Sequence, residues 1–180
     1  DGYAYDPEHP SQHIIDMSEN EIEVPEDYTR EELRQDLLCY TSPVLKENLV
    51  LTGDMTAELY ISSDAPDTDF VVRVTDVDEN GRSIKLADAL LSARYRNGFA
   101  RSEFLQEGEI VCLKIRTTKL SNCFRKGHRI RVTVTSSAKN FIFPNSNTRE
   151  GFASARTVVA HNRVYHGGLH ASRLTVRVEP

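Results

Sequence analysis

The sequence predicts an all-β fold, a sandwich or barrel of strands that follows an irregular N-terminal arm. Apolar and polar residues alternate in three segments, 55–62, 129–135 and 174–178. A period of two places one face of a strand in a core and the other toward solvent. Glycine-centred turns separate such segments, as at Asn80-Gly81, where both residue types tolerate a positive φ. Short strands with turns at this spacing are typical of a sandwich or barrel and not of βαβ units.

Residues 1–35 are predicted to form the arm and residues 36–180 the sandwich. Prolines in the polar first part of the arm favour extended, irregular geometry. Residues 25–35 are the best helix candidate, of two or three turns at most, because Pro25 and the acidic residues after it suit a helix N-terminus. The arm also has apolar residues that a solvated tail would not need: Tyr3, Tyr5, Ile14, Ile15 and Met17. We therefore expect the arm to dock on a partner domain and to be poorly ordered without it.

Two further strands are expected inside the sandwich. Residues 70–77 are apolar on both faces for part of their length, which indicates a central strand, and residues 109–116 form the other. The segments 125–128 and 165–168 contain glycine and are predicted to be tight connections.

Charge and hydropathy exclude several classes of protein. The net charge is −5, from 22 Lys and Arg against 27 Asp and Glu, whereas a nucleic-acid-binding surface needs clustered positive charge. The longest apolar runs are four residues, as at 110–113, so no transmembrane helix is predicted, and no signal peptide opens the sequence. We expect a soluble protein with neither nucleic-acid nor membrane partners. The compartment stays unassigned, with the cytoplasm favoured.

The three cysteines are predicted to be buried, reduced thiols. Their number is odd, no two have CxxC spacing, and a chain of 180 residues needs no disulfide to build a core. They are Cys39, Cys112 and Cys123.

Motifs that would support catalysis are absent. An α/β-hydrolase nucleophile elbow needs Gly-x-Ser-x-Gly, and no two glycines here lie four residues apart. Neither a Walker A motif nor GxGxxG occurs. The sequence therefore predicts no catalytic residue and no cofactor.

Two groups of residues have the chemistry of a metal site, and for each we favour a structural role. Asp64, Asp67 and Asp69 offer hard oxygen ligands for calcium but lack the frame of an EF-hand, and a turn whose carboxylates accept backbone N–H bonds explains them better. The histidines at 161, 166 and 170 have a spacing across Gly167-Gly168 that fits no common zinc motif. We expect them to lie in loops or at strand ends, and we predict no metal.

Arginines alternate in two strand-like segments, 94–96 and 129–131. A solvated or domain-docking face is favoured over an anion site, because no glycine-rich nest accompanies them.

A series of short motifs along the chain resembles a known family. The resemblance covers the chain from about residue 36 to the end, and its motifs follow in this order: Ser62-Ser63-Asp64-Ala65-Pro66-Asp67-Thr68-Asp69-Phe70, Val74-Thr75-Asp76-Val77, Asn80-Gly81-Arg82, Ala93-Arg94-Tyr95-Arg96, Ser121-Asn122-Cys123-Phe124, Lys126-Gly127-His128-Arg129-Ile130-Arg131-Val132, Ser136-Ser137, Asn145-Ser146-Asn147-Thr148 and His161-Asn162-Arg163-Val164-Tyr165-His166. They are similar to the C-terminal domain of X-Pro dipeptidyl-peptidases and CocE/NonD-type acyl hydrolases. The arm segment 3–7 resembles the linker that follows the catalytic domain in that family. Arg149 departs from the pattern, which has glycine there.

The resemblance implies a jelly-roll sandwich like that of galactose-binding modules, packed on the α/β-hydrolase domain of the same parent chain. The family's Ser-Asp-His triad lies in that other domain, so none of it falls on this sequence. In some relatives apolar arm residues line the acyl pocket, a role that would fall here to Ile14 and Ile15, although segment 12–17 lacks the expected glycines. A homo-oligomeric parent is left open.

Three functions are weighed from the sequence. The first is an accessory domain of a serine hydrolase that helps to wall the substrate pocket. The second is a carbohydrate-binding module, because lectins share the jelly roll, although the chain has no Trp to stack on a sugar. The third is an independent enzyme, which the missing elbow disfavours. The substrate of the parent, an Xaa-Pro peptide, an acylated amino acid or an ester, is not determined by these residues.

Overall fold

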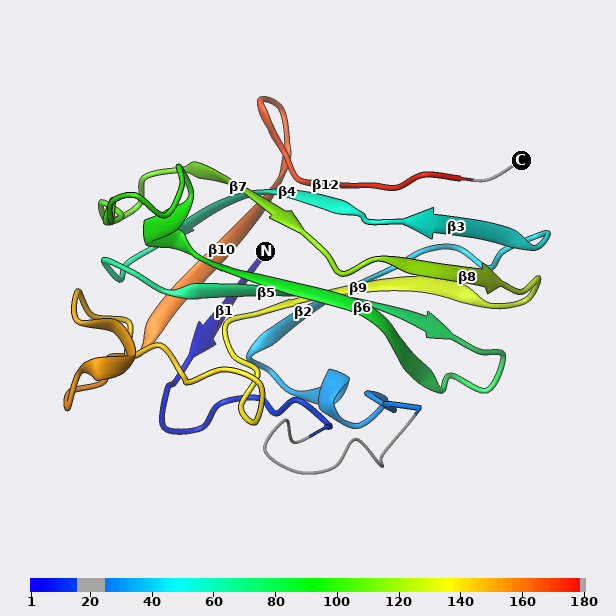
Figure 1. Ribbon diagram of the computed structural model, residues 1–180, viewed down its shortest axis with the longest axis horizontal. Helices are drawn as coiled ribbons and strands as arrows, with labels where there is room; N and C mark the ends of the chain where they lie inside the picture. The colour runs from blue at the N-terminus through cyan, green and yellow to red at the C-terminus, as the bar shows by residue number, and fades with distance from the viewer. Residues whose placement is uncertain (16–24, 179–180) are drawn as a thin grey trace.

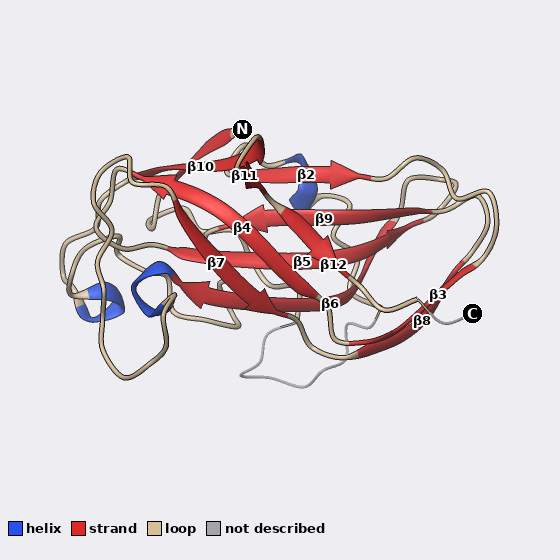
Figure 2. Cartoon of the chain, turned by 90° about the horizontal axis from the view of Figure 1, so that it is seen from above, coloured by secondary structure: helices blue, strands red, loops and turns tan. Residues whose placement is uncertain are grey.

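The structure, a computed structural model, describes residues 1–15 and 25–178 and shows a sandwich of antiparallel sheets (Figure 1, Figure 2). The larger sheet consists of β1 (Gly2–Tyr5), β4 (Thr56–Ser63), β7 (Val111–Arg116), β10 (Ala160–Gly167), β11 (His170–Ala171) and β12 (Arg173–Thr175). In this sheet β4 pairs with β7, β10 and β12, while β1 and β11 pair with β10.

The second sheet has the strand order β2-β9-β5-β6. Its strands are β2 (Leu37–Thr41), β5 (Asp69–Val77), β6 (Ser83–Ser92) and β9 (Arg129–Thr135). A two-stranded ribbon and three short 3-10 helices accompany the sheets in the described residues: β3 (Leu49–Gly53), β8 (Leu120–Phe124), η1 (Glu31–Leu33), η2 (Ala93–Tyr95) and η3 (Gly151–Ala153).

The hydrophobic core lies between the two main sheets, because the alternating residues of each sheet turn one face toward the other. Ile61 on β4, Leu113 on β7 and Val164 on β10 meet Phe70 and Val72 on β5, and none of these side chains is more than 1% exposed. Burying such a side chain contributes roughly 1.5–3 kcal/mol. The predicted all-β sandwich is confirmed, whereas the likeness to galactose-binding modules stays a prediction.

The outer face of β5 is also buried, because the arm crosses it (Figure 1). Arg73 and Thr75 point away from the core, yet they are 1% and 0% exposed. The guanidinium carbon of Arg73 lies 3.7 Å from the centre of the Tyr28 ring, and the Thr75 hydroxyl donates to the Glu32 carboxylate at 3.4 Å. Strand β5 is thus an interior strand buried on both faces, as predicted. Part of its outer face is polar, however, and the arm covers that part.

The described arm differs from the expected irregular segment. Gly2–Tyr5 pairs with β10 as strand β1, and Tyr3 and Tyr5 are buried beside the sandwich. Segment 25–35 contains only the single turn η1, not a helix of two or three turns. The reason is an edge pairing: Tyr28 N–H donates to Ser83 O, and Lys85 N–H donates to Glu26 O. Met17 and the rest of segment 16–24 lie outside the described residues, and the division of the chain at residue 35 stays a prediction.

The cysteine prediction is wrong in its burial. Cys39 and Cys123 are exposed and Cys112 is half-buried, although all three are free thiols. Each lies in a strand where the residues that alternate with it face the core, as Leu113 does beside Cys112. Strand alternation thus outweighs the general tendency of free cysteine to be buried.

Candidate functional site

The predicted loop of acidic residues connects β4 to β5, and its middle member is the most deeply placed. Asp67 is 0% exposed. One carboxylate oxygen accepts the Arg94 backbone N–H at 2.9 Å, and the other accepts Arg94 Nε and Asn145 Nδ2, both at 2.7 Å. Asn145 Nδ2 also donates to Asp69 Oδ1 at 2.9 Å, and burial raises the pKa of Asp69. The loop is thereby bound to two segments distant in sequence.

Asp64 stands apart from the other two carboxylates. It accepts the backbone N–H of His161 and lies beside its Nδ1, each at 2.7 Å, on an exposed part of the surface. His166 lies next to Tyr40 and Asp1, whereas His170 packs on the Tyr60 ring. The histidines thus have different partners. No group of three or more His, Cys, Asp or Glu in the described ranges is arranged to hold a metal ion, and the structural role of the acidic loop stays a prediction.

The two isoleucines proposed for a substrate pocket lie in unlike surroundings. Ile15 is 7% exposed and is buried against this domain itself. Ile14 is half-buried and lines an open groove of about 640 Å³ together with Arg82, Asp27 and Thr29. The described residues that border the groove are mainly polar or charged, and Ile14 is the large apolar one among them. A role for either residue in a parent enzyme stays a proposal.

A group of exposed aromatic residues was not predicted from the sequence. Phe99, Phe143 and Phe152 are 80%, 80% and 74% exposed. Phe143 stacks on Phe152 with ring centres 6.0 Å apart, and Tyr95 lies 5.4 Å from Phe99. We call these four residues the aromatic crest. No strand alternation runs through these residues: Tyr95 and Phe152 lie in the short helices η2 and η3, and Phe99 and Phe143 lie in loops.

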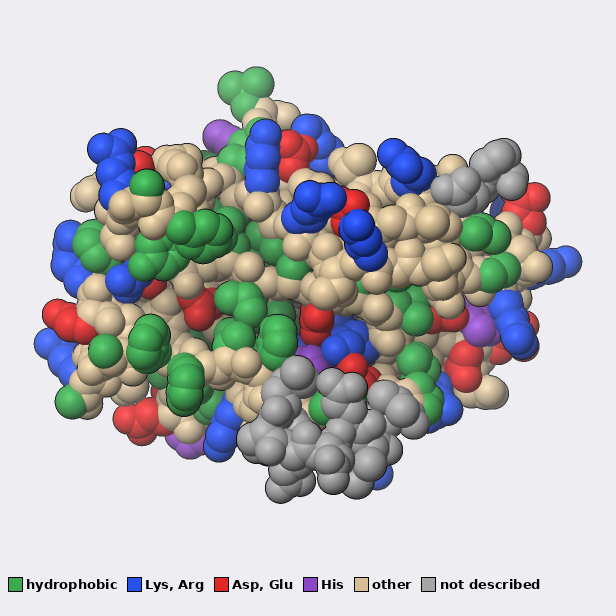
Figure 3. All heavy atoms as spheres, in the orientation of Figure 1, with side chains coloured by type: hydrophobic (Ala, Val, Ile, Leu, Met, Phe, Trp, Pro, Cys, Tyr) green, Lys and Arg blue, Asp and Glu red, His purple; other side chains and the backbone are tan. Residues whose placement is uncertain are grey.

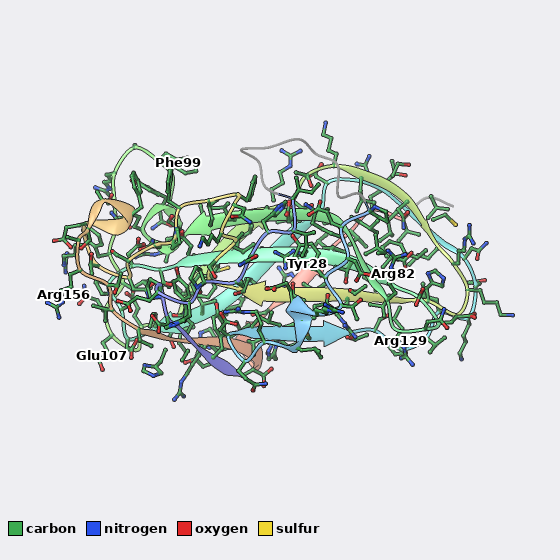
Figure 4. All side chains as sticks on the ribbon, turned by 90° about the horizontal axis from the view of Figure 1, so that it is seen from below. Tyr28, Arg82, Phe99, Glu107, Arg129 and Arg156 are labelled. Atoms are coloured by element: carbon green, nitrogen blue, oxygen red, sulfur yellow. The ribbon has the colours of Figure 1, made fainter. Side chains whose placement is uncertain are left out.

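The aromatic crest lies at one end of the molecule, above the acidic loop. Tyr95, Phe143 and Phe152 border a cavity of about 140 Å³ whose floor includes Asp67 and Asp69. Figure 3 shows apolar side chains gathered at this end, and Figure 4 places Phe99 there, well away from Tyr28 at the middle. Contiguous exposed apolar surface of this kind marks an interaction site in soluble proteins.

Hydrogen bonds from Arg94 hold together the segments beneath the aromatic crest. Besides Asp67, its guanidinium donates to the carbonyl oxygens of Thr148 and Arg149, each at 3.0 Å. The short helix η2 and the loop that leads into η3 are therefore joined through one side chain. The predicted choice of a docking face over an anion site for Arg94 stays a prediction, but its guanidinium is already occupied by partners within the chain.

Comparison with known proteins matches this chain to domains of larger enzymes. The family described as the X-Pro dipeptidyl-peptidase C-terminal non-catalytic domain matches residues 2–175. A cocaine esterase of Rhodococcus sp. (strain MB1 Bresler) is 35% identical over 185 residues, which cover 99% of this chain and 32% of the esterase. The chain thus spans about a third of that relative's length.

Two solved structures share the fold. An aminopeptidase from the marine sediment archaeon Thaumarchaeota archaeon superimposes with a TM-score of 0.92 at 24% identity, over 100% of this chain and 33% of that one. An alpha-amino acid ester hydrolase superimposes with a TM-score of 0.90 at 23% identity, over 99% of this chain and 32% of the hydrolase.

A β-sandwich that lacks a nucleophile elbow, and that matches a minor part of each larger hydrolase, defines a non-catalytic accessory domain. The chain belongs to the family of X-Pro dipeptidyl-peptidase C-terminal non-catalytic domains, as its motifs predicted. The carbohydrate-binding alternative receives no support from these relatives. Among the described residues no helix has both the length and the apolar character needed to cross a bilayer.

Proposed function

We propose that this domain packs on the α/β-hydrolase catalytic domain of its own parent chain and helps to wall the substrate pocket of a serine hydrolase. The observation that carries the proposal is the aromatic crest, whose phenylalanines are too exposed to stabilise this domain alone. The family's non-catalytic description and the unmatched two-thirds of the esterase relative support a partner within the same chain.

The energetics favour the crest as the docking surface. Burying one exposed phenylalanine contributes roughly 1.5–3 kcal/mol, and aromatic anchors are enriched at the centres of interfaces. Because Arg94 and Asp67 already fix the loops beneath, little ordering entropy is lost when the crest is covered. A preorganised apolar surface of this kind binds an apolar partner surface more tightly than mobile loops would.

The substrate of the parent belongs to the classes on which the relatives are named to act. One relative is named an esterase, another an amino acid ester hydrolase and a third an aminopeptidase. The bond attacked in all three classes is an acyl bond to oxygen or nitrogen, which a serine nucleophile in the partner domain would cleave. Of the two isoleucines predicted for the pocket, Ile14 lines an open groove, which supports a contact between Ile14 and such a substrate.

The docking proposal is tested in the full-length parent with Phe143→Asp and Phe152→Asp combined. Charge at the crest should weaken docking, so we expect the half-life of hydrolytic activity at elevated temperature to fall at least about tenfold, which is about 1.4 kcal/mol. Leu169→Asp is the matched control, because Leu169 is 91% exposed on the hairpin between β10 and β11.

The isolated domain with the double substitution should unfold within about 0.5 kcal/mol of wild type, as exposed positions usually do. A parent enzyme whose half-life is the same for the double variant, the control and wild type would exclude the crest as the docking surface.

A further inference from the structure

A cluster of charged side chains lies between the arm and the outer face of β6. Lys85 and Asp88 come from the strand, His13 comes from the arm before segment 16–24, and Glu26 comes from the arm after it. The Lys85 ammonium lies 2.5 Å from Glu26 Oε1, 2.9 Å from His13 Nε2 and 3.3 Å from Asp88 Oδ2. The four side chains are between 4% and 13% exposed. One ammonium therefore contacts both flanks of segment 16–24 at once.

The hydrogen bonds of His13 define its role in this cluster. Its Nδ1 lies 2.8 Å from the Ile15 carbonyl oxygen, which can only accept, so Nδ1 carries a proton. Its Nε2 lies 2.9 Å from the Lys85 ammonium and 3.3 Å from Asp88 Oδ2, and in the neutral ring it is the acceptor for the ammonium. The imidazole ring thus links the Lys85 side chain to the backbone of Ile15.

The two flanks are also joined to each other directly. The Tyr28 hydroxyl accepts the Ile14 backbone N–H at 3.0 Å and donates to Glu26 Oε2 at 3.2 Å. Burial raises the pKa of Tyr28, so its hydroxyl keeps the proton that this donation requires. Figure 4 shows Tyr28 at the centre of the molecule, under the sheet. Lys85 and Asp88 are the two members on β6, and of these Lys85 contacts both flanks.

The chemical composition of this cluster indicates positioning. Buried ion pairs lose solvation and commonly stabilise a fold less than apolar side chains of the same volume would, whereas their directional contacts fix one geometry. Here a compact ammonium with three donors meets acceptors from both arm flanks and from β6. An apolar side chain at residue 85 would fill the space without fixing the register of the flanks.

We propose that Lys85 is a positioning residue that holds residues 13–15 and 26–28 in place on the sheet, acting through His13 and Glu26. One consequence of the inference rests on the proposed function: the position of Ile14 determines which acyl groups the parent accepts. Its structural part concerns this chain alone and is tested separately.

The first test is amide hydrogen exchange of this chain with Lys85→Met. The Ile14 amide donates to the Tyr28 hydroxyl on the other flank, and the Tyr28 amide donates to Ser83 O on β6. We expect exchange at these two amides to accelerate at least tenfold while amides in β9 keep their wild-type rates. Lys114→Met is the matched control, because Lys114 pairs with Glu58 on the other sheet and is 72% exposed. Lys85→Arg, which retains the charge, should restore most of the protection.

Glu26→Gln provides a second variant whose change lies on the arm and leaves β6 intact. It should accelerate exchange at the same two amides, so the inference stays testable if Lys85→Met does not fold. Unchanged exchange at Ile14 and Tyr28 in a folded variant, or equal acceleration throughout the sandwich, would overturn the inference.

Kinetics of the full-length parent on a series of acyl substrates separate the inference from the proposed function. We expect Lys85→Met to change the ratio of KM values between substrates with different acyl groups at least threefold, with kcat nearly constant. Lys85→Arg should restore the wild-type ratio. Faster exchange at the flanks with unaltered acyl preference would uphold the positioning role of Lys85 and reject a pocket role for Ile14.

Discussion

A carboxylate that solvent does not reach needs donors from the protein, and Asp67 receives three of them from two distant segments. Its partner Arg94 is 12% exposed at the side chain and bonds two further carbonyl groups. These contacts connect the β4–β5 loop to the base of the aromatic crest. The stability of the acidic loop and the shape of the proposed docking surface therefore both depend on Arg94.

Asp67→Ala is expected to lower the free energy of unfolding by about 2–4 kcal/mol, because it removes a buried ion pair and leaves its donors unsatisfied. Asp64→Ala is the control, and at its exposed pair with His161 we expect a loss of about 0–1 kcal/mol. Urea denaturation measures both values. A melting temperature that calcium raises in wild type and not in Asp67→Ala would show that the loop binds a metal.

Asp69 gives the stability a defined dependence on pH. Burial raises its pKa, so the folded state binds the proton more tightly than the unfolded state does. The protonated Asp69 therefore adds to the stability of the folded state below the unfolded pKa of about 3.9, and this contribution is lost as pH rises through the pKa of Asp69 in the folded state. We expect Asp69→Asn to gain stability relative to wild type as pH rises from about 3 to 7. Denaturant melts across this range test it, and a difference between the two proteins that does not change with pH would contradict it.

At the scale of elements, strand β1 makes the arm part of the sandwich. Tyr5 is fully buried and its hydroxyl donates to the Asn145 carbonyl at 3.2 Å, while the Tyr3 hydroxyl lies 2.8 Å from Ser136 Oγ. Asn145 also binds the acidic loop. The strand that opens the chain thus contacts the same segment that supports the crest.

Tyr5→Ala should cost about 3–5 kcal/mol of unfolding free energy, as removal of a large buried aromatic side chain usually does. Tyr5→Phe removes only the hydroxyl and should cost about 1 kcal/mol. Denaturant unfolding of the isolated chain measures both. A loss below 1 kcal/mol for Tyr5→Ala would mean that β1 is dispensable and that the arm is an attached segment, as the sequence first indicated.

Periodicity predicted most of the strands that face the core, although the strand expected at 174–178 is the shorter β12, Arg173–Thr175. Strand β9 spans Arg129–Thr135, as its alternation indicated, and β5 begins one residue before the predicted Phe70. Segment 25–35 was predicted less well, because its backbone pairs with β6, a partner that local propensity does not reveal. The crest was missed for a related reason: a phenylalanine in a loop has no period that shows whether it is buried or exposed.

At the scale of the whole molecule, the chain has a self-sufficient core and two features that the core does not explain. The aromatic crest is exposed at one end, and the charged cluster around Lys85 fixes the arm beneath the second sheet. Both are preorganised by buried polar contacts.

The most direct test of the account compares amide hydrogen exchange in the isolated chain with exchange of the same residues in the full-length parent. If the crest docks on the catalytic domain, peptides covering residues 95–99 and 141–152 should exchange at least tenfold more slowly in the parent. The hairpin that contains Leu169 should exchange equally in both proteins, which provides an internal reference. Equal exchange of the crest peptides in the two proteins, with protection absent or confined to other faces, would contradict docking through the aromatic crest.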